Sequence, residues 1–120
     1  MNNLLADWLK IVVADPILHA RWLNTLSYLE NCGARKIAAC QHPTKVRREM
    51  LKHAAEEFRH AYYLKRQISQ LDVPGMEDYT PNSLLGGHQA LRYLDRLDVN
   101  ICRWLNLDQG FCGTSLHASA

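Results

Sequence analysis

The chain has 120 residues, of which 48% are hydrophobic and 22% charged, and its formal net charge is +2. This length suffices for one domain with a modest core, and the composition is ordinary for a globular protein. The net charge is too small to indicate nucleic-acid binding by itself. No apolar run approaches the length of a membrane span, and the N-terminal stretch lacks the basic region of a signal peptide.

The four cysteines show no Cys-x-x-Cys spacing, which a metal-binding or redox motif would have. Two of them fall in segments with a helical pattern. We interpret them as reduced thiols of a cytoplasmic protein, in preference to a disulfide framework. They are Cys32, Cys40, Cys102 and Cys112.

The first two predicted helices lie between residues 4 and 40. Residues 4–14 have the pattern of a short amphipathic helix. Asp15 and Pro16 are typical of an N-cap followed by proline at the first helical position, and predict a second helix that runs to about residue 40. The apolar stripe of this helix contains one acid, Glu30. An inward carboxylate is costly unless it is paired or binds a metal.

A long central helix is predicted over about residues 44–71, after a short connection in which Pro43 ends the preceding helix. The short connection predicts that the two long helices are antiparallel neighbours. Glu57 falls in the apolar stripe of the central helix, His60 lies on its flank one turn later, and Glu56 lies on the polar side. The stripe consists of Val46, Met50, Ala54, Ala61, Leu64, Ile68 and Leu71.

The last third of the chain predicts a loop over residues 72–81, a third long helix over 82–107 and a flexible tail over 108–120. Asp98 takes a place in the apolar stripe of the third helix. The expected fold is all-α, a single antiparallel helical bundle domain over residues 1–107, with three long helices and a short N-terminal one. Three helices leave one side of the bundle open, so we expect the N-terminal helix to cover part of it and a homodimer to cover the rest.

Glu57 and His60 form a Glu-x-x-His pair, which on a helix is a bidentate metal-binding element. Its oxygen and nitrogen donors suit Fe or Mn. With the connection at residues 41–44, a rise of about 1.5 Å per residue places Glu30 roughly 15 Å before the turn and Glu57 roughly 20 Å after it. The sequence therefore predicts a mismatch of about one helical turn between the two acids.

Glu30 on one helix and AAEEFRHAYYL on the next resemble the first half of a ferritin-like di-iron carboxylate protein. In that family one helix contributes a Glu and the next a Glu-x-x-His, and a second helix pair repeats the pattern. The resemblance covers about residues 16–71. It implies that Glu30 and Glu57 ligate or bridge the metals and that His60 binds one of them through an imidazole nitrogen, with Asp98 as the weakest candidate. The heme-oxygenase-like di-iron proteins are a neighbouring resemblance.

The second half of the family pattern is not found in this chain. Asp98 or Asp95 stands where a Glu is expected, and no second Glu-x-x-His follows. Three explanations stay open: the second half is missing from this chain, another copy supplies it, or the site is degenerate. The resemblance implies a di-iron or Fe/Mn oxidoreductase or oxygenase acting with dioxygen on a small-molecule substrate, with catalytic residues that the sequence does not identify. The alternative is a non-catalytic interaction or dimerisation module of ferritin-like shape.

Two further groups of residues have a functional and a structural interpretation. His53, one turn before Glu57, is either an extra ligand or a histidine hydrogen-bonded at the helix edge, and we favour the second. Basic residues around the first connection, such as Arg47 and Arg48, suggest a phosphate-binding stripe. We favour a solvated face in which Lys52 and Arg59 pair with nearby glutamates, and do not expect a nucleic-acid partner.

Overall fold

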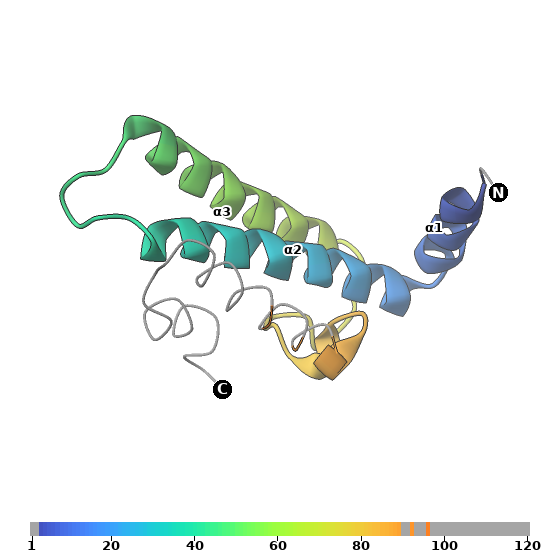
Figure 1. Cartoon of the computed structure of the whole chain (residues 1–120). Coiled ribbons are helices and arrows are strands. Elements are labelled where there is room, and N and C mark those ends of the chain that lie inside the picture. Colours follow the sequence, from blue (N-terminus) through green and yellow to red (C-terminus); the bar gives the residue numbers. More distant parts are fainter. Residues whose placement is uncertain (1–2, 90–91, 93–95, 97–120) are drawn as a thin grey trace.

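A computed structural model describes residues 3–89, 92 and 96 of the chain (Figure 1). Within these residues lie the helices α1 (Leu4–Ala14), α2 (Pro16–Ala39) and α3 (Arg48–Ser69) and a 3-10 turn, η1 (Pro81–Ser83). Residues 87–89, 92 and 96 are also helical, and no described residue is in a strand. The all-α class is therefore confirmed for this part of the chain. None of its helices is both long and apolar enough to cross a membrane. The predicted tail 108–120 and, of the predicted helix 82–107, residues 90–91, 93–95 and 97–107 lie outside the described residues.

The start of α2 follows from local chemistry. The Asp15 carboxylate accepts hydrogen bonds from the backbone amides of Ile17, at 2.9 Å, and Leu18, at 3.4 Å. Pro16 occupies the first helical position, where its missing N–H costs nothing. The helix therefore begins at the predicted residue and ends at Ala39, one residue before the predicted end.

The start of α3 differs from the prediction by four residues, because the helix begins at Arg48 and not near residue 44. Between the two helices, the imidazole Nδ1 of His42 accepts hydrogen bonds from the amides of Thr44, at 3.1 Å, and Lys45, at 3.0 Å. These amides are thus bound in a side-chain turn and do not open a helix. The connection consequently spans residues 40–47 and is longer than the sequence suggested.

The antiparallel arrangement of α2 and α3 forms the body of the described structure (Figure 1). Ala20 packs near Ile68 in one buried cluster, and the Ser27 hydroxyl donates a hydrogen bond of 2.8 Å to the backbone carbonyl of Ala61. Ala20 and Ser27 are fully buried and Ala61 nearly so. Because these side chains are small, the two backbones approach closely enough for a side chain on one helix to reach the main chain of the other.

A buried polar network holds the loop after α3 against this hairpin. The Lys65 ammonium donates hydrogen bonds to the Asn24 side-chain oxygen at 2.6 Å and to the carbonyls of Met76 at 2.7 Å and Glu77 at 3.1 Å. The Asn24 amide nitrogen donates in turn to the carbonyl oxygen of Ser83, at 3.1 Å, and to its hydroxyl oxygen, at 3.0 Å. Asn24 and Ser83 are buried, so the network joins helices and loop inside the structure, next to the apolar clusters that contain Met76 and Leu84.

Tyr79 completes the attachment of the loop. Its hydroxyl shares a 2.8 Å hydrogen bond with Ser27, its ring centroid lies 5.2 Å from that of Tyr28, and the Lys65 ammonium lies 4.4 Å from the centre of the same ring. Burial raises the pKa of the Tyr79 phenol and lowers the pKa of the Lys65 ammonium. Leu84, three residues beyond the start of η1, is buried in the cluster that contains Tyr28 and Cys32.

Helix α1 contacts only α2 among the described elements. Val12 is buried at this contact, and the rings of Trp8 and Trp22 meet edge to face at 6.1 Å. Figure 1 shows α1 leaving the N-terminal end of α2 at an angle. It therefore covers that end of α2 and not the length of the hairpin, and Leu4 and Ile11 on its outer side are exposed.

The predicted start of a helix near residue 82 is wrong. Pro81–Ser83 is a single 3-10 turn, and the φ angles of Gly86 and Gly87 are 88° and 53°. A helix that passed through these glycines would need φ near about −63° at both. Residues 87–89, 92 and 96 are helical, so the predicted third helix is present in the described residues but begins only at Gly87, after the turn at Gly86.

The network predicts that Lys65→Met destabilises the protein by about 1.5–3 kcal/mol, because three acceptors lose a charged donor. Lys52→Met, on the exposed side of the same helix, is the matched control, and we expect it to cost less than about 0.5 kcal/mol. Urea denaturation followed by circular dichroism measures both free energies of unfolding. Equal values for the two variants would contradict the structural role of Lys65.

Candidate functional site

Glu30 and Glu57 lie level with each other across the hairpin. Nine residues separate Glu30 from the last residue of α2, Ala39, and nine separate Glu57 from the first residue of α3, Arg48. The one-turn mismatch predicted from the sequence is therefore wrong, and its cause is the misplaced start of α3. The longer connection moves Glu57 back by about one helical turn, opposite Glu30.

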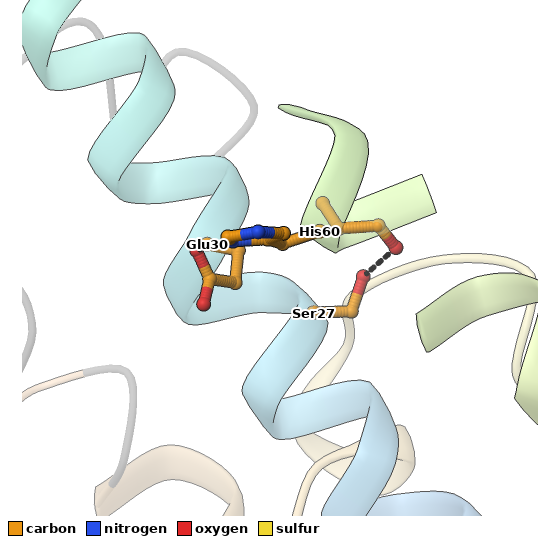
Figure 2. A network of polar contacts seen from close by, with 4 residues as sticks. Ser27, Glu30 and His60 are labelled. Atoms are coloured by element: carbon orange, nitrogen blue, oxygen red, sulfur yellow. Dashed lines mark hydrogen bonds and ion pairs between the residues drawn. The ribbon is translucent and has the colours of Figure 1, made fainter. Parts of the chain in front are cut away.

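Three side chains gather at this level, and we call them the Glu30–Glu57–His60 cluster. The Nδ1 atom of His60 lies 3.4 Å from the Oε2 atom of Glu30, and the Glu57 carboxyl hydrogen-bonds with that of Glu30. Figure 2 shows the Glu30 carboxylate beside the His60 imidazole, and the Ser27 hydrogen bond one turn along α2. The side chain of Glu30 is 32% exposed and that of His60 is 61% exposed. The cluster therefore lies at an open edge of the seam between α2 and α3.

Gly33 makes room for the carboxyl group of Glu57. A Cβ atom at Gly33 would lie 2.9 Å from the Oε2 atom of Glu57, closer than real Cβ contacts. The lack of a side chain at this position lets the Glu57 carboxyl rest directly against α2. Glu57 thus faces α2, as the apolar stripe predicts. The neighbouring Glu56 points to the polar side, with its side chain 40% exposed and an oxygen 3.9 Å from the Lys52 ammonium.

The electrostatics of the cluster centre on Glu57. The hydrogen bond with Glu30, then burial, then the charge of Glu30 raise the pKa of Glu57, while the charges of His60 and His53 lower it. A hydrogen bond between two carboxyl groups requires a proton on one of them. The two acids thus lie in contact, an arrangement that a bound cation would also stabilise.

The donors of the cluster are of the kinds that Fe and Mn bind, namely two carboxylates and an imidazole. In the described part of the chain, however, no group of three or more His, Cys, Asp or Glu side chains is arranged to hold a metal ion. The cluster by itself therefore does not complete a metal site. Asp98, the fourth predicted ligand, and its alternative Asp95 lie outside the described residues.

His53 is exposed on α3, and its charge acts on Glu57. It therefore belongs to the surroundings of the cluster, and within the described residues no hydrogen bond identifies it as a ligand or as a helix-edge residue. Gly33 is a site residue that was not among those predicted from the sequence. The spacing of Gly33 from Glu30, i to i+3 on the same face, is the sequence signal that points to its contact with the acid on the next helix.

Cys32 and Cys40 take part in no disulfide within the described part of the chain, and the reduced state of the cysteines stays a prediction. Burial raises the pKa of the Cys32 thiol. The hydrogen bond with Tyr28 and the nearby positive charges lower this pKa, but by less than burial raises it. A raised thiol pKa disfavours the thiolate, which is the nucleophilic and metal-binding form. Cys32 is therefore a packing residue of the cluster it forms with Tyr28 and Leu84.

Comparison with protein-family models, curated proteins and solved structures finds no match to this chain. The resemblance to ferritin-like di-iron proteins therefore rests on Glu30, Glu57 and His60 and on their helices.

The raised pKa of Glu57 predicts how stability depends on pH. The folded protein holds this proton more tightly than the unfolded chain, whose glutamate pKa is about 4.3. The stabilisation is present below that value and is lost as the pH rises through the folded pKa. Glu57→Gln removes the charge, so we expect its melting temperature to exceed that of the wild type at pH 7.5 and the difference to shrink towards pH 4.

Thermal melts of the metal-free protein at several pH values test this expectation. Glu56→Gln is the matched control, because it removes only the exposed contact with Lys52 and leaves the cluster intact. A Glu57→Gln variant whose advantage is constant across the pH range would mean that the carboxyl pair is not the source of the effect.

Proposed function

We propose that this chain is a ferritin-like, metal-dependent helical protein in which Glu30, Glu57 and His60 supply part of a di-iron or Fe/Mn site. The observation that carries the proposal is the pairing of two carboxyl groups at one level of adjacent helices, with an imidazole against one of them. Two acids in contact need a positive charge or a shared proton, and a divalent cation with several oxygen ligands meets that need.

The resemblance assigns the roles within this proposal. The carboxylates of Glu30 and Glu57 ligate or bridge the metals, and His60 contributes an imidazole nitrogen. The chemistry that such a centre supplies is the binding and reduction of dioxygen, which makes the protein an oxidoreductase or oxygenase in a reducing, cytoplasmic environment. Gly33 positions Glu57 by leaving space for its carboxyl group. The proposed bundle includes the third helix over residues 82–107.

The remaining ligands come, in this proposal, from a second copy of the chain. The open edge of the seam supports this, since exposed ligands such as His60 require a covering surface that excludes water. A second Glu30–Glu57–His60 cluster would provide the four carboxylates and two imidazoles of the family pattern.

The alternative function is a non-catalytic interaction or dimerisation module of ferritin-like shape. One observation favours it: the described residues contain no three-donor group arranged for a metal. In this alternative the inward acids are satisfied by each other and by His60, through the contacts described above. Protein from iron-supplemented growth that carries less than about a tenth of an equivalent of Fe or Mn would favour the module over the metal site.

Metal binding is tested by two adjacent substitutions with opposite expectations. Glu57→Ala is expected to abolish Fe and Mn binding while the helix stays formed, and to leave the metal-free protein as stable as the wild type or more so, because an inward acid is lost. Glu56→Ala is expected to keep the metal and to cost about 0.2–0.5 kcal/mol. Metal analysis and melting temperatures with and without chelator provide the readouts.

A third variant, Gly33→Ala, refines this test. Alanine favours the helix over glycine by about 0.5–1 kcal/mol, so any loss of metal cannot be assigned to a weaker helix. We expect weaker metal binding, because the new methyl group displaces the Glu57 carboxyl. If Glu56→Ala loses metal and Glu57→Ala keeps it, the site is not the one proposed.

The proposed second copy predicts a homodimer at micromolar concentration. Light scattering or sedimentation measures the mass, and a dimer of the 13.8 kDa chain is the expected species. A monomer that nevertheless binds metal would place the remaining ligands in the same chain. A monomer without metal would leave the cluster as a paired acid site only.

A further inference from the structure

A hollow of about 340 Å³ lies between α2 and α3 near their connecting turn. Ligand-binding pockets in proteins begin at about 300 Å³, and an apolar cavity of about 150 Å³ can hold benzene. The hollow is therefore large enough for a small organic molecule. Its lining is largely apolar, and the residues around it are Lys36, Ile37, Cys40, Glu49, Met50 and His53.

The hollow is next to the Glu30–Glu57–His60 cluster. Ile37 follows Gly33 by four residues on α2, and His53 precedes Glu57 by four on α3, so each lies one turn along the same face. One turn corresponds to about 6 Å. His53 belongs to both features, because it lines the hollow and its charge acts on the Glu57 carboxyl.

The chemistry of the lining favours a neutral, apolar guest. Ile37 and Met50 are half-buried and present methyl and thioether groups, and methionine adapts its shape to different guests. An ion placed against these side chains would lose hydration without gaining a matching set of hydrogen bonds. Burial lowers the pKa of Lys36 at the edge of the hollow, in line with an apolar lining.

We propose that the hollow binds the apolar part of a small neutral substrate and holds it beside the Glu30–Glu57–His60 cluster. The role as a substrate site rests on the proposed function, whereas the binding of an apolar molecule does not require a metal.

The methionines of the chain allow a direct test. There are three, of which Met50 lines the hollow and Met76 is buried under the loop at the other end of the hairpin. Toluene is titrated into the full-length, metal-free protein labelled with ¹³C at the methionine methyl groups. We expect a saturable shift of the Met50 methyl signal that exceeds any shift of Met76, which lines other hollows beneath the loop. Equal shifts of all methyl signals, or a shift of Met76 alone, would overturn the proposal.

Substitutions in the lining locate the binding. Ile37→Phe fills the hollow and is expected to weaken toluene binding at least about tenfold. Cys40→Leu narrows it from another position and keeps the test informative if Ile37→Phe does not fold. Val73→Ile, in the loop beside Met76, is the matched control and is expected to leave the Met50 response unchanged. A Met50 shift that survives both lining substitutions would place the guest elsewhere and contradict the inference.

Manganese uptake measured by equilibrium dialysis on the same samples separates the two proposals. If toluene shifts Met50 but the protein takes up no Mn²⁺, the hollow stands as a binding site and its assignment as a substrate site falls with the proposed function. If Mn²⁺ binds and toluene does not shift Met50, the metal site stands and the hollow is not its substrate site.

Discussion

The Lys65 ammonium is the interaction on which the rest of the described structure depends. An ammonium has three protons to donate, and here they go to one side chain on α2 and two carbonyls of the following loop. The side-chain amide of Asn24 in turn donates hydrogen bonds to the carbonyl and hydroxyl oxygens of Ser83. The helical hairpin and the loop are therefore joined by hydrogen bonds at a place where few large apolar side chains are buried. The charge is tolerated because its acceptors and the Tyr79 ring replace its water.

The opposite half of the hairpin uses the same close approach of α2 and α3 for a different purpose. Small residues between the helices bring side chains of one helix to the backbone of the other, as Ser27 and Ala61 show. Further along, the absence of a side chain at Gly33 admits the carboxyl group of Glu57. Two acids then come into contact, which raises the pKa of Glu57, and the His60 imidazole lies against Glu30. The close approach of α2 and α3 thus also brings the carboxyl groups of Glu30 and Glu57 into contact.

The cluster and the hollow beside it form one continuous region of α2 and α3. Acid and imidazole side chains lie in its middle, and an apolar space follows towards the connecting turn. Such an order, with polar groups in a row next to an apolar recess, is typical of sites that act on small organic molecules. The loop that Lys65 holds is packed at the other end of the hairpin, so it stabilises the helices without obstructing this region.

The sequence by itself determined the features that depend on neighbouring residues. Asp15 and Pro16 specify the start of α2, and the periodicity of α3 distinguishes the inward Glu57 from the outward Glu56, because both follow from geometry within a turn or two. Only the tertiary structure decided that Glu30 and Glu57 lie opposite each other. The hydrogen bonds from the amides of Thr44 and Lys45 to His42 lengthen the connection, so α3 begins later than predicted. The periodicity of the helices carries no information about the length of the connection between them. The tertiary structure also decided the role of Asn24. A polar residue on a helix is normally predicted to face solvent, and the acceptors and donors that make its burial favourable come from residues 41 to 59 positions away.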